Sequence, residues 1–233
     1  MRLLLFSNST NAGEAYLAYP MPYIESFLNG VKTVRFVPYA GVTFSHDEYE
    51  ADVQERFSGI GTKVESVHHF DDPAGAIMEA EAIVVGGGNT WRLLELMQQK
   101  GMVDAVRQRV MAGVPYVGWS AGSNVACPTI RTTNDMPICE PKGMGAFDLI
   151  PFQINPHYLD ANPDGHAGET REDRIMEFIE VNRETYVVGL REGTMLKLEN
   201  GGIELVGPRP ARIFLYGRVP MEVRPGVDMS FLL

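Results

Sequence analysis

The clearest candidate for chemistry in this sequence is Ser120, the central residue of a G-x-S-x-G run at 118–122. The run follows the apolar segment 114–119 and precedes a short, helix-compatible segment that ends at Pro128. A sharp turn between a strand and a helix exposes such a serine above the edge of a sheet, and the flanking glycines relieve crowding there. We therefore interpret Ser120 as a nucleophile. The alternative is an ordinary serine in a glycine-flanked turn.

A serine nucleophile needs a general base, and two of the five histidines follow Ser120 in the chain, His157 and His166. His157 comes directly after Asn155 and Pro156, where a predicted strand ends. Ligands of parallel sheets bind at the carboxyl ends of the strands, so His157 is the preferred base. His166 lies in a loop rich in Pro, Asp and Gly, which is typical of a solvated side chain. The alternative for His157 is a structural histidine held by hydrogen bonds.

A carboxylate usually orients the imidazole in such a site. The sequence leaves four candidates open, Asp135, Asp148, Asp160 and Glu192. The chain order of the α/β-hydrolases would place the acid between serine and histidine, which favours Asp135 or Asp148. Glu192 follows a predicted strand at 186–190 and lies between two nearby glycines, where a side chain can reach inward. It is equally well explained as a solvated acid at the tip of a hairpin.

A second glycine-rich run, Gly-Gly-Gly-Asn-Thr at 86–90, follows the predicted strand 81–85 and precedes a predicted helix. It matches neither the G-x-G-x-x-G pattern of dinucleotide-binding proteins nor a Walker loop. The amide of Gly88 could instead join that of Ala121 in an oxyanion hole, which stabilises negative charge on a reacting carbonyl oxygen. The alternative is a tight connection between a strand and a helix without a chemical role.

Composition and charge exclude several classes of partner. The chain has 233 residues, of which 45% are hydrophobic, and this predicts one globular α/β domain spanning 1–233. The formal net charge of -10 argues against nucleic acids and anionic membranes, because both are polyanions. A small acidic ligand remains compatible with this charge if one or two arginines dominate the field inside a pocket.

The sequence indicates no metal site, export signal or membrane span. The two cysteines, Cys127 and Cys139, have no CxxC or zinc-ligand spacing. His46, His68 and His69 are interpreted as helix-start and strand-end residues without HExxH or other ligand spacing. The apolar N-terminal run is too short for a signal peptide, and no apolar stretch reaches transmembrane length. We therefore expect a cytoplasmic protein with reduced thiols and without a metal or other cofactor.

Short apolar runs alternate with segments of helical spacing, which is typical of a mostly parallel central sheet with helices on both faces. The pattern predicts strands at 2–6, 33–37, 63–67, 81–85 and 114–119. Helices are predicted at 14–28, 46–57, 73–80 and 90–112, the last of them broken near Gly101.

The alternation loosens after Pro128, where a long irregular segment begins that is typical of functional loops. A strand is predicted at 152–155, and Thr170-x-x-Asp173 predicts the capped start of a helix that continues to about Val181. C-terminal antiparallel strands are predicted at 186–190, 195–198, 203–206 and 212–216, the first two joined by a turn at 191–193.

Taken together, these segments resemble the peptidase E family, the aspartyl dipeptidases, whose fold is similar to that of class I glutamine amidotransferases. The resemblance covers nearly the whole chain to about Gly202. It rests on the segments 7–10, 37–42, 86–90, 118–137, 155–157, 168–171 and 189–193. Agreement at all of these segments is far more specific than a single G-x-S-x-G run. Beyond Gly202 the strands are predicted from their pattern alone.

The resemblance implies a serine peptidase that cleaves after an unblocked N-terminal aspartate in dipeptides. Ser120, His157 and Glu192 fall on the triad positions of the family. The resemblance thereby selects Glu192 as the acid and lowers the weight of Asp135 and Asp148. We expect a small acidic dipeptide as the substrate, no cofactor, and a monomer or a homodimer.

Selection of an aspartyl side chain favours a fixed guanidinium, because that group binds a carboxylate through two charge-assisted hydrogen bonds. Arg171, in the first turn of the capped helix, is the first candidate, and Arg131 is the second. Either could instead form a structural salt bridge. Glu169 and Asp135 are candidates for binding the substrate's amino group, and Asn89 is a candidate for a further substrate contact.

Two other functions fit the same motifs. A cyanophycinase-like or isoaspartyl-cleaving relative would share the triad but would need a wider cleft for a branched polymer. A non-catalytic, amidotransferase-like binding module would keep the turn around Ser120 as scaffold alone, since function depends on the site rather than on the fold. Activity on α-linked and β-linked aspartyl dipeptides distinguishes the first alternative from an aspartyl dipeptidase. Labelling of Ser120 by a serine-reactive probe distinguishes a catalytic serine from the second alternative, the binding module.

Overall fold

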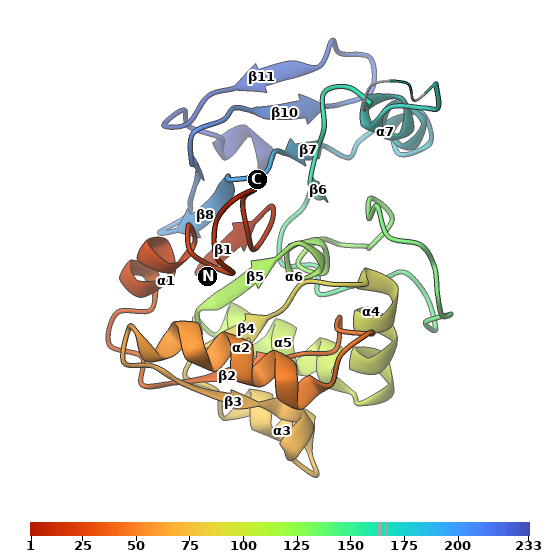
Figure 1. The fold of residues 1–233 in the computed structure, drawn as a ribbon. Helices are drawn as coiled ribbons and strands as arrows, with labels where there is room; N and C mark the ends of the chain where they lie inside the picture. Colours follow the sequence, from red (N-terminus) through yellow and green to blue (C-terminus); the bar gives the residue numbers. More distant parts are fainter. Residues whose placement is uncertain (163–164, 166) are drawn as a thin grey trace.

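Two β-sheets form the frame of the protein in the computed structural model, which describes residues 1–162, 165 and 167–233 (Figure 1). The larger sheet contains β1 (Leu3–Phe6), β2 (Thr33–Val37), β3 (Lys63–Ser66), β4 (Ile83–Val85), β5 (Tyr116–Trp119), β8 (Met195–Glu199) and β9 (Gly202–Val206). The smaller sheet contains β6 (Gln153–Pro156), β7 (Val187–Leu190), β10 (Ala211–Phe214) and β11 (Met221–Val223). The strand orders are β3-β2-β4-β5-β1-β8-β9 and β11-β10-β7-β6.

The strands of the larger sheet from β3 to β1 run parallel, and β8 and β9 extend this sheet by antiparallel pairing. β1 pairs with β5 so that Leu3 lies opposite Tyr116 and Phe6 lies opposite Trp119. Every residue of β1, β4 and β5 is buried, as expected for parallel strands that are covered on both faces. The carboxyl ends of these three strands therefore meet at one edge of the sheet, where Ser120 follows β5.

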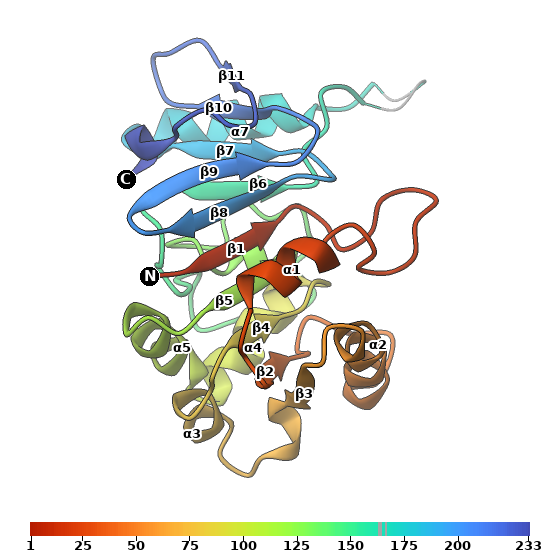
Figure 2. The same ribbon diagram turned by 90° about the vertical axis from the view of Figure 1, so that its left-hand side faces the viewer.

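Helices cover both faces of the larger sheet. α1 (Met21–Phe27) and α2 (His46–Ser58) pack on one face with Phe6 and Phe36. α3 (Pro73–Met78), α4 (Thr90–Gln99) and α5 (Met102–Met111) pack on the other face with Leu5 and Val85. Figure 2 shows the two groups of helices on opposite sides of the sheet. In the part of the chain that the structure describes, none of the helices has the length and apolar character needed to cross a bilayer.

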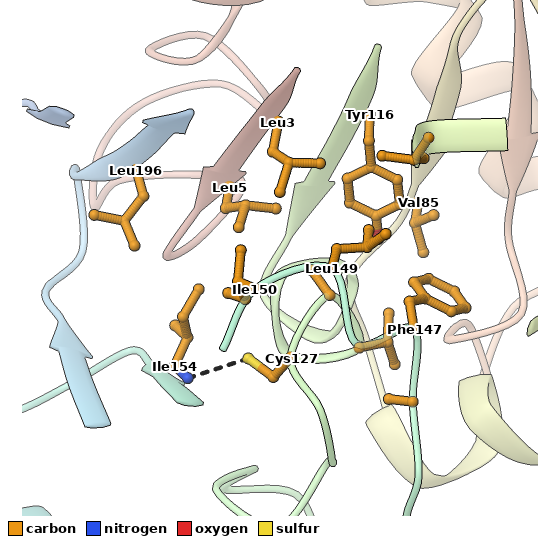
Figure 3. Close-up of a cluster of buried hydrophobic side chains, with 14 of the residues drawn as sticks. Leu3, Leu5, Val85, Tyr116, Cys127, Phe147, Leu149, Ile150, Ile154 and Leu196 are labelled. Carbon is orange, nitrogen blue, oxygen red and sulfur yellow. Dashed lines mark hydrogen bonds between the residues drawn. The ribbon is translucent and has the colours of Figure 1, made fainter. Parts of the chain in front are cut away.

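The smaller sheet shares a hydrophobic core with the larger sheet. Ile154 of β6 and Val188 of β7 belong to the same buried cluster as Leu3 and Leu5 of β1, and Figure 3 shows part of this cluster. Cys127 lies within it, and the backbone N–H of Ile154 donates a hydrogen bond to its Sγ over 3.2 Å. Burial raises the pKa of the Cys127 thiol to about 12, so this thiol stays uncharged at neutral pH.

The opposite face of the smaller sheet is covered by α7 (Arg171–Val181), whose Ile175 and Ile179 pack with buried side chains of β7 and β10. The predicted cap of this helix is confirmed. The Thr170 hydroxyl accepts a hydrogen bond from the N–H of Asp173, and the Asp173 carboxylate accepts one from the N–H of Thr170. The start of α7, which carries Arg171, is therefore held by local contacts.

The predicted α/β fold, with a mostly parallel sheet, helices on both faces and C-terminal antiparallel strands, is confirmed. The division into two sheets was not predicted. The turn at 191–193 joins β7 to β8 as predicted, but it carries the chain from the smaller sheet to the larger sheet, so Glu192 does not lie at the tip of a hairpin. β11 was not predicted either, because only one of its three residues is buried and its pattern is weak.

The helix predicted at 14–28 is much shorter in the structure, where α1 begins at Met21 and ends at Phe27. Pro20 and Pro22 explain the difference. Proline has no N–H to donate, and its ring clashes with the preceding turn, so a helix cannot run through both positions without breaking. The break predicted near Gly101 is confirmed, because this residue separates α4 from α5.

The loop before α1 ties the end of β1 to the turn that follows β7. Asn8 is buried, and its Oδ1 accepts a hydrogen bond from the N–H of Gly193 over 2.8 Å. The Tyr19 hydroxyl lies 2.6 Å from Asn8 O and 2.7 Å from Asn8 Oδ1, and it donates one hydrogen bond that these two acceptors share. Because a buried acceptor is costly to leave without a donor, the Tyr19 hydroxyl helps to fix Asn8 and, through it, the turn.

Replacement of Tyr19 by phenylalanine tests this contact. We expect Tyr19→Phe to lower the free energy of unfolding by about 1 to 3 kcal/mol, because Asn8 O loses its side-chain donor and Asn8 Oδ1 keeps only the N–H of Gly193. Urea unfolding followed by circular dichroism measures the change. Tyr23→Phe is the matched control, since Tyr23 is 41% exposed and its loss should change stability by less than about 0.5 kcal/mol. Parental stability of Tyr19→Phe would contradict this role of the hydroxyl.

Candidate active site

Ser120 lies on a sharp turn between β5 and the short helix α6 (Ala121–Asn124). Its backbone has φ 52° and ψ -111°, a combination that residues other than glycine rarely adopt. The N–H of Ser120 donates to Phe6 O over 3.1 Å, and Ser120 O accepts from the N–H groups of Ser123 and Asn124, each over 3.0 Å. These bonds hold a backbone conformation that costs about 1 to 3 kcal/mol, which is typical of functional sites.

The two glycines of the G-x-S-x-G run are required by close backbone packing. A Cβ atom on Gly118 would lie 2.5 Å from Gly122 O, and a Cβ atom on Gly122 would lie 2.2 Å from Val85 O. Both distances are far shorter than a van der Waals contact. The two glycines of the G-x-S-x-G run are therefore needed because the turn at Ser120 packs closely on itself and on β4.

His157 follows β6, and its imidazole faces Ser120, with 2.9 Å between Nε2 and Ser120 Oγ. The N–H of His157 donates to Ser7 Oγ over 2.9 Å, and the Ser7 hydroxyl donates to Leu190 O over 2.7 Å. The buried Ser7 side chain at the end of β1 therefore fixes the backbone that carries His157. His166, the alternative histidine, lies outside the described residues.

Glu192 extends the hydrogen-bonded chain, because its Oε1 lies 2.7 Å from His157 Nδ1. Parallel pairing of β6 with β7 places Pro156 opposite Leu190, so the residues that follow these two strands meet at one edge of the smaller sheet. An ionised Glu192 accepts a hydrogen bond from the N–H at Nδ1, and the Nε2 of the neutral imidazole is then free to accept the Ser120 hydroxyl proton. The structure thus brings Ser120, His157 and Glu192 together.

Two of the other acids that the sequence left open pair with arginines elsewhere. Asp148 lies 3.0 Å from the Arg107 guanidinium. Asp160 Oδ2 accepts a hydrogen bond from Arg191 Nε over 2.9 Å. Neither acid contacts His157 within the described residues, so neither can orient its imidazole.

Asp135 lies near the site but supports the start of α4. Its Oδ2 accepts from the N–H of Thr90 over 2.7 Å, from the Thr90 hydroxyl over 2.6 Å and from the Thr133 hydroxyl over 3.1 Å. The carboxylate therefore satisfies an amide that a helix start leaves free. Its Oδ1 has no hydrogen-bond partner within the described residues, and Asp135 lines the cavity at Ser120. This carboxylate can bind a cationic group there while keeping its structural contacts.

Gly88 and Ala121 supply two backbone amides near Ser120. Gly88 has φ 133°, and a Cβ atom at this position would lie 2.2 Å from Ala40 O, so no other residue fits. In the part of the chain that the structure describes, neither amide donates to a backbone carbonyl. Two such free amides beside a serine hydroxyl can accommodate the oxyanion of a tetrahedral intermediate.

Two cavities meet at Ser120, His157 and Asp135. The smaller, of about 350 Å³, has a polar lining that includes Arg171, and we call it the Arg171 pocket. The larger, of about 490 Å³, is called the Tyr16 pocket here. In addition to the shared residues, its lining includes Tyr16, Phe44, Tyr49, Asp52, Gly88 and Trp119. A substrate bound across Ser120 would therefore have a cationic pocket on one side and a largely aromatic pocket on the other.

Arg171 is the first residue of α7, and within the described residues its guanidinium has no hydrogen-bond or ion-pair partner. The salt bridges considered from the sequence do not form, because Glu172 pairs with Arg212 over 2.8 Å and Asp173 caps the helix. Burial lowers the pKa of Arg171 from its ordinary value, and the nearby Asp135 carboxylate opposes this shift. An arginine still stays charged at neutral pH, so the pocket contains a fixed cation.

Three of the predicted substrate-binding residues do not line either cavity in the described part of the chain. Arg131 is exposed. Glu169 is exposed as well, and its carboxylate lies 3.7 Å from Arg174 Nε. Asn89 caps α4, because its Oδ1 accepts from the N–H of Arg92 over 3.0 Å. Sequence position near a motif does not determine the direction of a side chain, which depends on tertiary packing.

Sequence reasoning missed the residues that form the Tyr16 pocket. Tyr49 of α2 donates to Gly87 O over 2.9 Å and accepts from Trp119 Nε1 over 3.3 Å. Burial raises the pKa of Tyr49 to about 12, so its hydroxyl stays protonated at neutral pH. Tyr16 comes from the loop before α1 and Asp52 from α2. No local motif marks these residues, because folding alone brings their segments together.

The arrangement contains the components of nucleophilic acyl transfer. A serine hydroxyl is hydrogen-bonded to an imidazole, the imidazole to a carboxylate, and two free amides lie near the serine. The cavities on both sides leave room for a small substrate.

The packing of the turn predicts a strong effect of a single methyl group. We expect Gly122→Ala to lower the free energy of unfolding by at least about 2 kcal/mol and the melting temperature by roughly 4 to 8 °C, because its Cβ would collide with Val85 O. Gly143→Ala is the matched control, since nothing lies within 4 Å of a Cβ atom there. Differential scanning calorimetry compares the two variants. Equal melting temperatures would show that the turn at Ser120 tolerates the methyl group.

Comparison with known proteins identifies relatives along the whole chain. The chain is 47% identical over 233 residues to Peptidase E of Nostoc sp. (strain PCC 7120), a match that spans 100% of this chain and 96% of the relative. It is 47% identical over 226 residues to Peptidase E of Salmonella typhimurium (strain LT2), spanning 97% of this chain and 99% of the relative. The expected resemblance to peptidase E is therefore confirmed.

Solved structures share the fold. A peptidase from an acI-B1 Actinobacterium superposes with a TM-score of 0.73 at 16% identity and covers 99% of this chain and 96% of its own. A putative Peptidase E protein from Listeria monocytogenes gives a TM-score of 0.64 at 21% identity and covers 89% of this chain and 98% of its own. The model of Peptidase family S51 matches residues 3–206. With this match and relatives of 47% identity, the chain belongs to Peptidase family S51.

Proposed function

We propose that this peptidase hydrolyses dipeptides with an unblocked N-terminal aspartate through an acyl-enzyme on Ser120. The observation that carries the proposal is the Arg171 guanidinium, which lies in the same pocket as Ser120 and His157 and has no ion-pair partner in the part of the chain that the structure describes. In a protein of net charge -10, an acidic substrate is repelled unless a fixed cation offsets the field within the pocket. The membership in Peptidase family S51 supports the peptidase activity.

In the proposed mechanism, Ser120 attacks the carbonyl carbon of the aspartyl residue while His157 Nε2 takes the hydroxyl proton. Glu192 stabilises the imidazolium that forms and keeps Nδ1 protonated. The amides of Gly88 and Ala121 bind the oxyanion of the tetrahedral intermediate. His157 then gives the proton to the leaving amine. Water, activated by the same imidazole, hydrolyses the acyl-enzyme and regenerates Ser120. No step uses a metal or other cofactor.

The Arg171 pocket is proposed to bind the aspartyl residue. The planar guanidinium can hold the substrate side-chain carboxylate with two hydrogen bonds. Asp135 Oδ1 has no hydrogen-bond partner among the described residues and lines the same pocket, so it can accept from the substrate's α-ammonium group, which would explain a requirement for an unblocked N-terminus. With both charges fixed, the scissile carbonyl is positioned at Ser120. Asp135 is a better candidate for this contact than Glu169, which does not line either cavity within the described residues.

The Tyr16 pocket is proposed to take the second residue of the dipeptide. Its aromatic side chains, Tyr16, Phe44 and Tyr49, offer apolar surface. A large apolar second residue would therefore gain from burial against these rings. An acidic second residue would approach Asp52, which lines the same pocket, and like charges at short range disfavour binding.

A panel of dipeptides tests the substrate assignment. We expect Asp-Leu to be cleaved, and we expect Glu-Leu, Asn-Leu, N-acetyl-Asp-Leu and β-linked Asp-Leu to be poor substrates. The glutamyl side chain is too long for a fixed guanidinium, and the asparaginyl amide cannot form an ion pair. Release of leucine, followed by chromatography, measures hydrolysis. The Ser120→Ala variant should reduce it by at least about ten thousand-fold with an unchanged circular dichroism spectrum.

The panel also separates the alternatives. Cleavage of β-linked Asp-Leu without cleavage of Asp-Leu would support an isoaspartyl peptidase and contradict the proposal. Absence of hydrolysis together with failure of a fluorophosphonate probe to label Ser120 would support a binding module without catalysis. Activity of Ser120→Ala within about tenfold of the parent would remove the nucleophile assignment.

The role of Arg171 is tested with a matched pair of variants on α7. We expect Arg171→Met to reduce kcat/KM on Asp-Leu by roughly 30-fold to several thousand-fold, because an unpaired substrate carboxylate costs about 2 to 5 kcal/mol. Arg174→Met is the control: it removes the same charge one turn away, where the side chain is 58% exposed. It should keep nearly parental kinetics. Labelling of Ser120 by a small neutral probe should be unchanged in both variants.

Steady-state kinetics on Asp-Leu decide between the outcomes. Parental kcat/KM in Arg171→Met would show that this guanidinium does not bind the substrate, and equal losses in both variants would indicate a general effect of charge. Loss of probe labelling in Arg171→Met would indicate damage to the nucleophile instead of a change in specificity.

A further inference from the structure

A second group of reactive side chains lies outside both cavities, where α2 meets the 3-10 helix Val67–His69. Asp47 and Glu50 come from the first turns of α2, and His68 and His69 come from the segment after β3. One ligand-type atom of each residue lies within 4.8 Å of the corresponding atoms of the other three. The spacing in the sequence could not show the cluster, because its two halves come from different elements.

Three contacts already link the four side chains of this cluster. His68 Nε2 lies 2.8 Å from Asp47 Oδ1, and His69 Nε2 lies 2.6 Å from Glu50 Oε2. His69 Nε2 also lies 3.6 Å from Asp47 Oδ1, which joins the two pairs. Ligand atoms around a tetrahedral zinc ion, with bonds of about 2.0 Å, are separated by roughly 3.3 Å. The four atoms, all within 4.8 Å of one another, are close to that separation.

Outer contacts orient two of the four side chains. Glu50 Oε1 accepts a hydrogen bond from the N–H of Ser66 over 2.7 Å, which leaves Oε2 directed at the cluster. His68 Nδ1 lies 2.5 Å from Ser66 Oγ, so Nε2 is the nitrogen that faces Asp47. Metal-binding histidines and carboxylates commonly have such contacts on the atom that does not bind the metal. Glu50 and His68 are mostly buried, whereas Asp47 and His69 are exposed enough for an ion to enter from solvent.

We propose that Asp47, Glu50, His68 and His69 bind a divalent transition metal ion, with Zn²⁺ as the best match. Two imidazole nitrogens and two carboxylate oxygens are a donor set that suits zinc, whereas Mg²⁺ and Ca²⁺ prefer oxygen ligands alone. Two ionised carboxylates and two neutral imidazoles carry a total charge of -2, which a divalent cation neutralises. Two surface ion pairs would account for the short contacts, but they do not require all four atoms to converge.

The proposed site is structural and not catalytic. It is not part of the lining of the cavities at Ser120. It would join the first turns of α2 to the 3-10 helix after β3. α2 also carries Tyr49, whose hydroxyl donates to Gly87 O at the wall of the Tyr16 pocket. A bound ion would therefore stabilise the fold and fix the position of α2, without taking part in the reaction at Ser120.

Calorimetry and thermal unfolding test this proposal with protein that carries no histidine tag and has been dialysed against a chelator. We expect one Zn²⁺ to bind per chain at pH 7.5, and the melting temperature to rise by about 5 to 10 °C when free Zn²⁺ exceeds Kd by roughly 100-fold. Glu50→Gln and His69→Ala should each weaken binding by at least roughly 10-fold. Glu55→Gln removes the same charge from an exposed position of α2 outside the cluster and should bind as the parent does.

Titration with Co²⁺ gives an independent readout, because a tetrahedral Co²⁺ site with nitrogen and oxygen ligands absorbs visible light. Absence of binding heat and of a thermal shift in the parent would overturn the proposal, and so would unchanged Zn²⁺ affinity in both Glu50→Gln and His69→Ala. Circular dichroism of the metal-free variants checks that they fold. Hydrolysis of Asp-Leu by the metal-free parent should persist, so failure of the metal site and failure of the proposed peptidase mechanism are distinguishable.

Discussion

The arrangement of the site depends on the parallel pairing of β6 with β7. In this register Pro156 lies opposite Leu190, so the residues that follow the two strands are brought to one edge of the smaller sheet. Ser7, at the end of β1, then bonds both to the backbone of His157 and to Leu190 O, which joins this edge to the larger sheet. A slip of one residue would turn the imidazole away from Ser120, because side chains alternate between faces of a strand.

The site contains a cation although the protein is acidic, and contacts from several elements keep this cation available. The protein carries a formal charge of -10, yet the pocket beside Ser120 contains the guanidinium of Arg171, which has no hydrogen-bond or ion-pair partner among the described residues. That cation stays available because Arg212 pairs with Glu172, which could otherwise pair with it. On the other side of the serine, α2 presents Tyr49 to the second pocket. Through α2, the side-chain cluster proposed to bind zinc is connected to the walls of the active site.

Local sequence patterns were sufficient for prediction where a residue's role depends on its immediate neighbours in the chain. The turn at Ser120 was predicted because glycines on both sides are a backbone requirement, and Gly122 indeed packs against Val85 O. The cap of α7 was predicted for the same reason, since Thr170 and Asp173 bond to each other's backbone within one turn. Strands β1, β4 and β5 were predicted because strands buried on both faces are apolar nearly throughout.

The sequence by itself therefore determined most of the elements, the nucleophile turn and the histidine that follows a strand, because these depend on short-range backbone constraints. The sequence left four acids open, and only a family resemblance selected Glu192, whose contact with His157 depends on strand pairing. The tertiary structure alone decided that Arg131 and Glu169 are exposed and outside the linings of the two cavities, and that His68 and His69 meet carboxylates of α2. Such contacts join residues far apart in the chain, and the packing of the two sheets and their helices sets the direction of each side chain.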